Sequence, residues 1–162
     1  LEEADGTRED DGSLSAMGRR SFADAFPIGI DAEAFSQFYG TKEGDKSLSM
    51  VRAELEDRKQ IIGVDRIDYS KGLPERFTAF ERLLELYPEH KGEVTLLQIA
   101  PPSRSEVRAY SQIQRLLEQL SGRINGRFSD LDWTPIQFLS RSFPRRALAG
   151  IYRGSRVGGP RP

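Results

Sequence analysis

Residues 61–77 read IIGVDRIDYSKGLPERF, and this stretch determines how the rest of the sequence is interpreted. Its first four residues form a short, apolar, largely β-branched run without polar alternation, which is typical of a buried parallel strand. From Pro74 onward, apolar residues recur with helical spacing, and proline suits a first helical turn because its missing N–H would have no partner there. The stretch therefore predicts a strand, a loop and a helix, with Arg66 and Lys71 in the loop. Because open α/β sheets bind ligands beyond the carboxyl ends of their strands, these two cations predict a phosphate or pyrophosphate site.

The alternation of strand and helix continues downstream. Short apolar runs predict strands, and apolar residues at helical spacing predict helices between them. Strand–helix units joined by short loops predict a parallel sheet. The expected fold class is therefore α/β, one half of a doubly wound parallel sheet domain. The expected elements are strands at 60–64, 93–100 and 135–139, and helices at 48–55, 74–88, 103–122 and 143–152.

Three segments fall outside this alternation. Residues 1–15 are polar and acidic, and as a free end they bury too little apolar surface to become ordered. Residues 122–132 contain glycine and many charges and predict a loop. A fourth strand is due near Ser155, but the sequence VGGPRP at 157–162 contains the glycines and prolines that a central strand does not tolerate.

The composition narrows the classes of function. A chain of 162 residues, 37% of them hydrophobic, is long enough for one domain with a core. Its net charge of −1 provides no overall attraction to nucleic acid or membranes. Cysteine is absent and histidine occurs once, so disulfides, thiolate sites and histidine-rich metal sites are excluded. No apolar run approaches the roughly 20 residues of a transmembrane helix, and the expected location is the cytoplasm.

Several ordered segments point to one protein family. The central stretch matches the pattern V-x-R-x-D-Y-x-K-G-x-x-x-R. The other matching segments are FPIGID at 26–31, QIAPPSR at 98–104, GRINGR at 122–127 and WTPI at 133–136. In these segments the chain resembles the trehalose-6-phosphate synthases, which are retaining glycosyltransferases of family 20.

The resemblance implies a fold and a domain organisation. The fold is part of a GT-B-type glycosyltransferase. Residues 1–57 are expected to be the tail of an N-terminal domain and an interdomain linker. Residues 58–157 are expected to form the first half of a C-terminal Rossmann-like domain that binds the nucleotide sugar. Residues 158–162 are expected to be an aberrant end.

The resemblance also assigns roles to four residues. Arg66 and Lys71 are implied to contact the pyrophosphate of UDP-glucose and to act in catalysis, because they stabilise the negative charge that grows on the leaving diphosphate. Since these cations stand where other enzymes use a metal, neither a metal ion nor a cofactor is implied. Arg104 is implied to bind the phosphate of the acceptor, glucose 6-phosphate. The backbone of Phe143 is implied to lie against the nucleotide, with the donor.

Each assignment has a plainer alternative. Loop cations are usually solvated, and an arginine in a first helical turn is usually a surface residue. For Phe143, the sequence alone favours a place in the core. Asp65 and Asp68 resemble a pair of catalytic carboxylates, but the retaining mechanism of the family is not thought to need a carboxylate nucleophile, so both are assigned to loop structure.

The resemblance covers only the middle of such a synthase. We therefore expect a fragment of a retaining glucosyltransferase that makes trehalose 6-phosphate, inactive alone because catalysis needs both substrates aligned. The alternative is a non-catalytic remnant that binds nucleotide or phosphate. A third hypothesis is a polyanion-binding product that uses the arginines between 141 and 161. The full-length parent is expected to be a homo-oligomer with no nucleic-acid or membrane partner.

Overall fold

The computed structural model describes residues 6–22, 24–25, 27–102 and 108–158. The chain separates into two compact units, Leu1–Ala32 and Glu33–Pro162. The first unit contains a small antiparallel sheet. The second contains the parallel sheet and the helices that cover it.

The first unit is a three-stranded antiparallel sheet of β1 (Thr7–Arg8), β2 (Leu14–Ala16) and β3 (Arg19–Ser21) in that order. Met17 and Gly18 join β2 to β3 with positive φ angles of 51° and 69°, which matches the two-residue turn that follows the twist of a hairpin. Asp11 accepts hydrogen bonds from the Ser13 backbone N–H at 3.1 Å and from its hydroxyl at 2.7 Å. Local turn chemistry thus orders part of the segment for which the sequence predicted disorder.

The second unit is built on a four-stranded parallel sheet of β4 (Lys59–Val64), β5 (Val94–Ile99), β6 (Ile136–Leu139) and β7 (Val157–Gly158). The order across the sheet is β6-β5-β4-β7, and β4 pairs with β5 in register from Lys59–Val94 to Val64–Ile99. The chain thus adds strands outward from β4 to β6 and then returns to the other side of β4, which is the order of a doubly wound sheet. The predicted fold class is confirmed.

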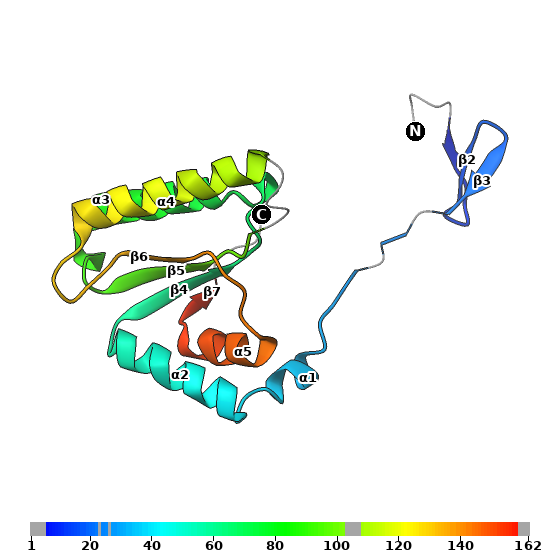
Figure 1. Ribbon diagram of the computed structural model, residues 1–162. Coiled ribbons are helices and arrows are strands. Elements are labelled where there is room, and N and C mark those ends of the chain that lie inside the picture. Colours follow the sequence, from blue (N-terminus) through cyan, green and yellow to red (C-terminus); the bar gives the residue numbers. More distant parts are fainter. Residues whose placement is uncertain (1–5, 23, 26, 103–107, 159–162) are drawn as a thin grey trace. The chain divides into compact units, whose positions relative to one another are not determined.

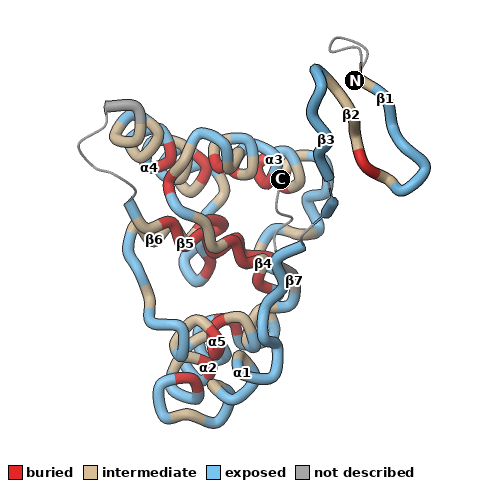
Figure 2. The backbone as a smooth tube through the Cα atoms, turned by 90° about the vertical axis from the view of Figure 1, so that its right-hand side faces the viewer, coloured by how far each residue is buried: buried red, intermediate tan, exposed pale blue. Residues whose placement is uncertain are grey.

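Two layers of helices enclose this sheet. Figure 1 shows α3 (Leu73–Leu86) and α4 (Arg108–Phe128) on one face, and α2 (Lys42–Leu55) and α5 (Arg145–Gly154) on the other. The remaining helices, α1 (Ala32–Ser36), η2 (Tyr69–Lys71) and η3 (Pro88–His90), are short. Figure 2 shows that the buried residues gather on β4, β5 and the inner sides of the helices. The two faces of the sheet therefore have separate cores.

Alternation along the strands assigns each residue to one of these cores. Leu96 faces the α3–α4 core, and its neighbour Leu97 faces the α2–α5 core. Trp133 belongs to the α3–α4 core and is 4% exposed. Its indole N–H lies 3.2 Å from the carbonyl of Val94 and 3.1 Å from the hydroxyl of Thr95, at the amino end of β5.

The structure corrects further expectations. Helix α2 begins at Lys42, six residues before the predicted helix 48–55, and the Thr41 hydroxyl caps it by accepting from the Gly44 N–H. Helix α4 continues to Phe128, through residues predicted to form a loop, because Ile124 is fully buried and the Asn125 amide bonds both backbone groups of Ile136. Residues Val157–Gly158 form β7 and pair with Ile61 and Ile62, although their composition argued against a strand. Two residues suffice there because the neighbouring strand is already ordered. The predicted division at residue 57/58 stays a prediction.

Candidate functional site at the carboxyl edge of the sheet

The carboxyl ends of the parallel strands meet at one edge. β4 ends at Val64, β5 at Ile99 and β6 at Leu139, and these residues are in register across the sheet. The loops after β4 and β6 therefore leave the sheet at the same edge, on either side of β5. They contain three of the four residues that the sequence predicted to bind substrates: Arg66 and Lys71 after β4, and Phe143 after β6.

The loop after β4 is tied to the end of β5 by its backbone. The N–H of Asp65 donates to the carbonyl of Ile99 at 3.1 Å, and the N–H of Ile67 donates to the carbonyl of Pro101 at 3.1 Å. Ile67 is buried in the core beneath α3 and α4. Arg66 lies between these two anchored residues and is exposed. The backbone on both sides of Arg66 is therefore anchored to the end of β5 and to the residues that follow it.

A second cation follows on a tight turn. Asp68 caps η2, because its carboxylate accepts from the Ser70 N–H at 2.9 Å and from the Ser70 hydroxyl at 2.8 Å. These bonds, and then the nearby charges of Arg66 and Lys71, hold the pKa of Asp68 below its ordinary range. Gly72, with a φ of 57°, then turns the chain into α3. Arg66 and Lys71 are thus gathered in the loop that leads into α3, the charge pattern that accepts a phosphate group.

The predicted role of the two aspartates in loop structure agrees with their contacts. Asp65 forms an ion pair with Arg76 of α3 at 2.8 Å, and Asp68 bonds Ser70. The two carboxylates thus bind different partners and do not form the catalytic pair that their spacing suggested. Arg76 is a residue whose place at the site sequence reasoning missed, although it occupies the last fixed position of the central pattern.

Phe143 lies in the loop between β6 and α5. Its side chain packs on the core formed by Ile62, Leu97, Ile99 and Ile151, and the guanidinium of Arg141 lies 4.7 Å from the centre of its ring. The side chain is half-buried and packs against the edge of this core, close to the place that the sequence alone favoured. The predicted contact of its backbone with a nucleotide stays a prediction. Arg104, the predicted acceptor-binding residue, lies outside the described residues.

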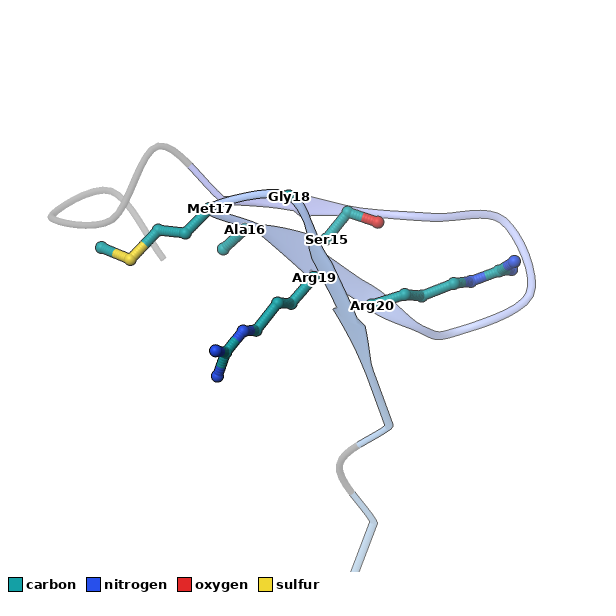
Figure 3. Close-up of a pocket in the computed structure, with 6 residues that line it drawn as sticks. All are labelled: Ser15, Ala16, Met17, Gly18, Arg19 and Arg20. Atoms are coloured by element: carbon teal, nitrogen blue, oxygen red, sulfur yellow. The ribbon is translucent and has the colours of Figure 1, made fainter.

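The surface has hollows elsewhere that do not contain the predicted residues. One of about 500 Å³ lies at the amino edge of the sheet, between Arg52, Arg58 and Arg156. Another, of about 340 Å³, lies on the turn of the small sheet (Figure 3), where the side chains of Met17 and Arg19 point away from those of Ser15 and Arg20. Neither hollow brings catalytic groups together.

In the part of the chain that the structure describes, no group of three or more histidine or acidic side chains is placed to hold a metal ion. Over the same residues, no helix has the length and apolar character needed to cross a membrane.

Comparison with known proteins gives consistent matches over nearly the whole chain. The sequence profile of glycosyltransferase family 20 matches residues 3–158. Trehalose-6-phosphate synthase of Cronobacter sakazakii is 47% identical over 148 residues, which are 91% of this chain and 31% of that protein. The enzyme of the same name from Sinorhizobium fredii is 45% identical over 147 residues, which are 91% of this chain and 32% of that protein.

Solved structures agree with these sequence matches. The α,α-trehalose 6-phosphate synthase of Burkholderia multivorans superposes with a TM-score of 0.87 at 50% identity, covering 94% of this chain and 32% of that one. The UDP-forming α,α-trehalose-phosphate synthase of Burkholderia xenovorans, in complex with glucose-6-phosphate, gives a TM-score of 0.88 at 45% identity, covering 97% and 35%. An Escherichia coli structure bound with UDP-2-fluoro glucose gives 0.88 at 41% identity, covering 97% and 35%. The chain thus spans about a third of the length of the relatives it matches.

Proposed function

The chain belongs to glycosyltransferase family 20, and from this membership we propose that it provides the donor diphosphate site of a retaining glucosyltransferase. Its sheet is half of the doubly wound domain of a GT-B glycosyltransferase. The proposed reaction transfers glucose from UDP-glucose to glucose 6-phosphate and yields trehalose 6-phosphate and UDP. The observation that supports this most is the placement of Arg66 and Lys71 together in the loop between β4 and α3.

The proposed role of the two cations follows from the charge that develops in the reaction. When the bond between glucose and the diphosphate breaks, negative charge grows on the leaving oxygen. Arg66 and Lys71 are held on an anchored loop before the substrate arrives, so they stabilise that charge more in the transition state than in the ground state. The N-terminal turn of α3 adds partial positive charge in the same place. The backbone at Phe143 completes the donor site.

The same proposal includes the binding of the acceptor and the cellular location and oligomeric state of the full-length enzyme. Arg104, which comes after β5 in the sequence, binds the phosphate of glucose 6-phosphate. The chain spans about a third of its relatives, so the remaining contacts come from elsewhere in a full-length enzyme. The 162 residues alone bind the donor diphosphate without turnover. The full-length enzyme is a cytoplasmic homo-oligomer without nucleic-acid partners.

Calorimetric titration with UDP tests the proposed donor site. The 162-residue chain is titrated with UDP at low ionic strength, together with Arg66→Ala, Lys71→Ala and a control, Arg115→Ala, which removes an exposed arginine from α4. We expect each of the first two variants to bind UDP about tenfold more weakly, equivalent to one hydrogen bond to a charged group, and the control to bind like the wild type. Equal affinities in all four proteins, or no binding by any of them, would refute the proposal.

If the chain is a nucleotide-binding remnant, the UDP affinities in this titration would be the same, but a full-length enzyme that contains it would form no product. Residues 1–162 are grafted in place of the matching third of the Burkholderia multivorans synthase. Formation of trehalose 6-phosphate by the chimera, lost with Arg66→Ala, supports the enzymatic role. A folded chimera that binds UDP but forms no product favours the remnant.

A further inference from the structure

A buried polar cluster lies beneath the loop that contains Arg66. One guanidinium nitrogen of Arg76, Nη1, lies 2.8 Å from Asp65 Oδ2 and 2.7 Å from Gln98 Oε1. The side chains of Arg76 and Asp65 are 13% and 12% exposed, and Gln98 is fully buried. The cluster therefore joins three elements at one point: the first turn of α3, the loop after β4, and the strand β5.

Gly63 of β4 leaves the space that the cluster occupies. A Cβ atom on Gly63 would lie 2.5 Å from Arg76 Nη1 and closer still to Gln98 Oε1. Real Cβ atoms do not approach other atoms so closely, so a side chain at position 63 would displace the guanidinium or the amide. Glycine in the middle of a strand normally weakens it, because it adds backbone freedom and packs nothing. Its presence here makes room for the bonds of Arg76.

These bonds fix the residue before Arg66 in two ways. The backbone N–H of Asp65 bonds Ile99, and its carboxylate bonds Arg76, so neither the position nor the rotation of Asp65 is free. The next peptide unit leads directly to Arg66. A buried ion pair is weak evidence for stability, since well-packed apolar residues stabilise a core equally well, but it does define one geometry.

We propose that Arg76, together with Asp65 and Gln98, is a positioning residue that orients Arg66 for a nucleoside diphosphate. This inference rests on the proposed function, because it assumes that Arg66 binds the diphosphate. Arg76 itself does not touch the ligand. It acts through Asp65, and Gly63 keeps the space that the arrangement needs.

The same helix offers a matched control. Glu81 of α3 binds Arg123 of α4 through two bonds of 2.6 and 2.7 Å. This pair joins α3 to α4, and among the described residues it makes no hydrogen bond or ion pair with the loop at 65–72. Arg123→Met therefore breaks another arginine–carboxylate pair of α3, one whose arginine is half exposed, without disturbing Arg66.

The test combines UDP titration with a measurement that needs no ligand. The proteins compared are the wild type, Arg76→Met, Arg76→Lys, Asp65→Asn, Gly63→Ala and the control Arg123→Met. We expect Arg76→Met, Asp65→Asn and Gly63→Ala to bind UDP about tenfold more weakly. Arg76→Lys should recover part of the affinity, because lysine keeps the positive charge but lacks the planar guanidinium with its several donors. Arg123→Met lowers the melting temperature but leaves the affinity unchanged.

Limited digestion with trypsin supplies the second readout. Arg66 and Lys71 are themselves sites of tryptic cleavage, and cleavage in a folded protein follows local opening of the chain. We expect faster cleavage after Arg66 in the cluster variants than in Arg123→Met. If Arg76→Met does not fold, Asp65→Asn, which keeps the shape of the side chain, gives the same comparison.

The outcomes separate this inference from the proposed function. Wild-type binding that depends on Arg66 but is equal in Arg76→Met overturns the positioning role and leaves the proposed function intact. Cleavage after Arg66 that is no faster in the cluster variants than in Arg123→Met also overturns it. Absence of UDP binding by the wild type refutes the proposed function and the positioning of Arg66 with it.

Discussion

Glu81 shows how a single buried carboxylate is held in this chain. Its side chain is 9% exposed and accepts hydrogen bonds from Arg123 and, at 3.3 Å, from Arg127. The bonds from Arg123 are the main cause that keeps the pKa of Glu81 below its ordinary value of 4.5, and Arg127 adds to them against the opposing effect of burial. A carboxylate whose pKa is lowered by folding stabilises the folded state above the ordinary pKa and ceases to do so as the pH falls.

The first prediction concerns the pH dependence of this contribution. The free energy of unfolding of the wild type should exceed that of Glu81→Gln at pH 7, and the difference should shrink as the pH falls below 4.5 and through the lowered pKa. Urea denaturation followed by circular dichroism at several pH values measures it. In the double variant Arg123→Met, Arg127→Met, the effect of Glu81→Gln should lose most of its pH dependence. A difference that stays constant with pH would contradict the assignment.

Among single residues, the sequence predicted the placement of the two loop cations better than the side-chain contacts beneath them. Arg66 and Lys71 could be placed in one loop because strand, loop and helix signals are local. The partnership of Arg76 with Gln98 could not, because it joins residues 22 positions apart across two elements. The one local signal was Gly63, a glycine in an apolar run that otherwise favours a strand.

At the scale of elements, α2 and α5 approach each other closely through glycines. A Cβ atom on Gly150 would lie 2.9 Å from the carbonyl carbon of Gly44 and closer to its oxygen. A Cβ atom on Gly154 would similarly meet Val51. The layer that covers the second face of the sheet is therefore held at a distance that only glycine permits.

The second prediction compares two glycine substitutions. Gly150→Ala should destabilise the chain by about 1–3 kcal/mol or more, because the new methyl group meets backbone that cannot rotate away. Gly126→Ala in α4 should stabilise it by about 0.5–1 kcal/mol, because that position is open and alanine favours a helix. Chemical denaturation of both variants measures the difference. Equal effects would show that the close approach of α2 and α5 is not required.

Helix α4 is tied to the edge strand β6 by one side chain. The amide of Asn125 donates to the carbonyl of Ile136 at 2.8 Å and accepts from its N–H at 2.9 Å. The N–H and the carbonyl of Ile136, which no further strand pairs in the described sheet, thereby both have a hydrogen-bond partner.

The third prediction tests this tie. Asn125→Ala should cost about 1–3 kcal/mol, because it leaves a buried donor and acceptor of Ile136 unpaired. Gln114→Ala, which removes an exposed hydrogen bond to Glu118 on the same helix, should change the stability by no more than about 0.5 kcal/mol. Thermal denaturation of the two variants measures both effects. A loss in Asn125→Ala as small as that in Gln114→Ala would contradict the tie, because alanine is the better helix former and propensity alone would not destabilise the helix.

The elements that sequence reasoning placed correctly share one property. β4, α3, β5 and β6 are each defined by their own apolar pattern, and the structure has them within a few residues of the predicted bounds. The last turns of α4 lack such a pattern, since glycines and arginines surround Ile124. Their helical state depends on burial of that one side chain and on Asn125, which are tertiary effects that a local pattern does not contain.

At the scale of the whole molecule, the chain consists of two units of unequal size. The last part of the first unit, before α1, is exposed: Ile28 and Ile30, for example, have 99% and 81% of their surfaces accessible. Each unit has its own sheet, and both buried apolar clusters described above consist of residues of the larger unit. The larger unit therefore contains all that its core requires.

The fourth prediction follows from this independence. Deleting residues 1–30 should leave the melting temperature of the remaining chain within about 2 °C of the main transition of the whole, a change well below 1 kcal/mol. Scanning calorimetry measures the transition. Chymotrypsin, which cleaves after aromatic residues, should cut first after the exposed Phe22. A strongly destabilised deletion variant would show that the small sheet supports the larger unit.

The place of Trp133 has a spectroscopic consequence. It is the only tryptophan in the sequence, so fluorescence excited selectively in indole comes from one site. The buried ring should emit at short wavelength in the folded chain and shift to longer wavelength when the α3–α4 core opens to water. Trp133 bonds residues at the amino end of β5, at the edge opposite Arg66, so binding at the proposed nucleotide site should leave its emission unchanged. The native chain thus reports its own unfolding separately from ligand binding, without an added dye or label.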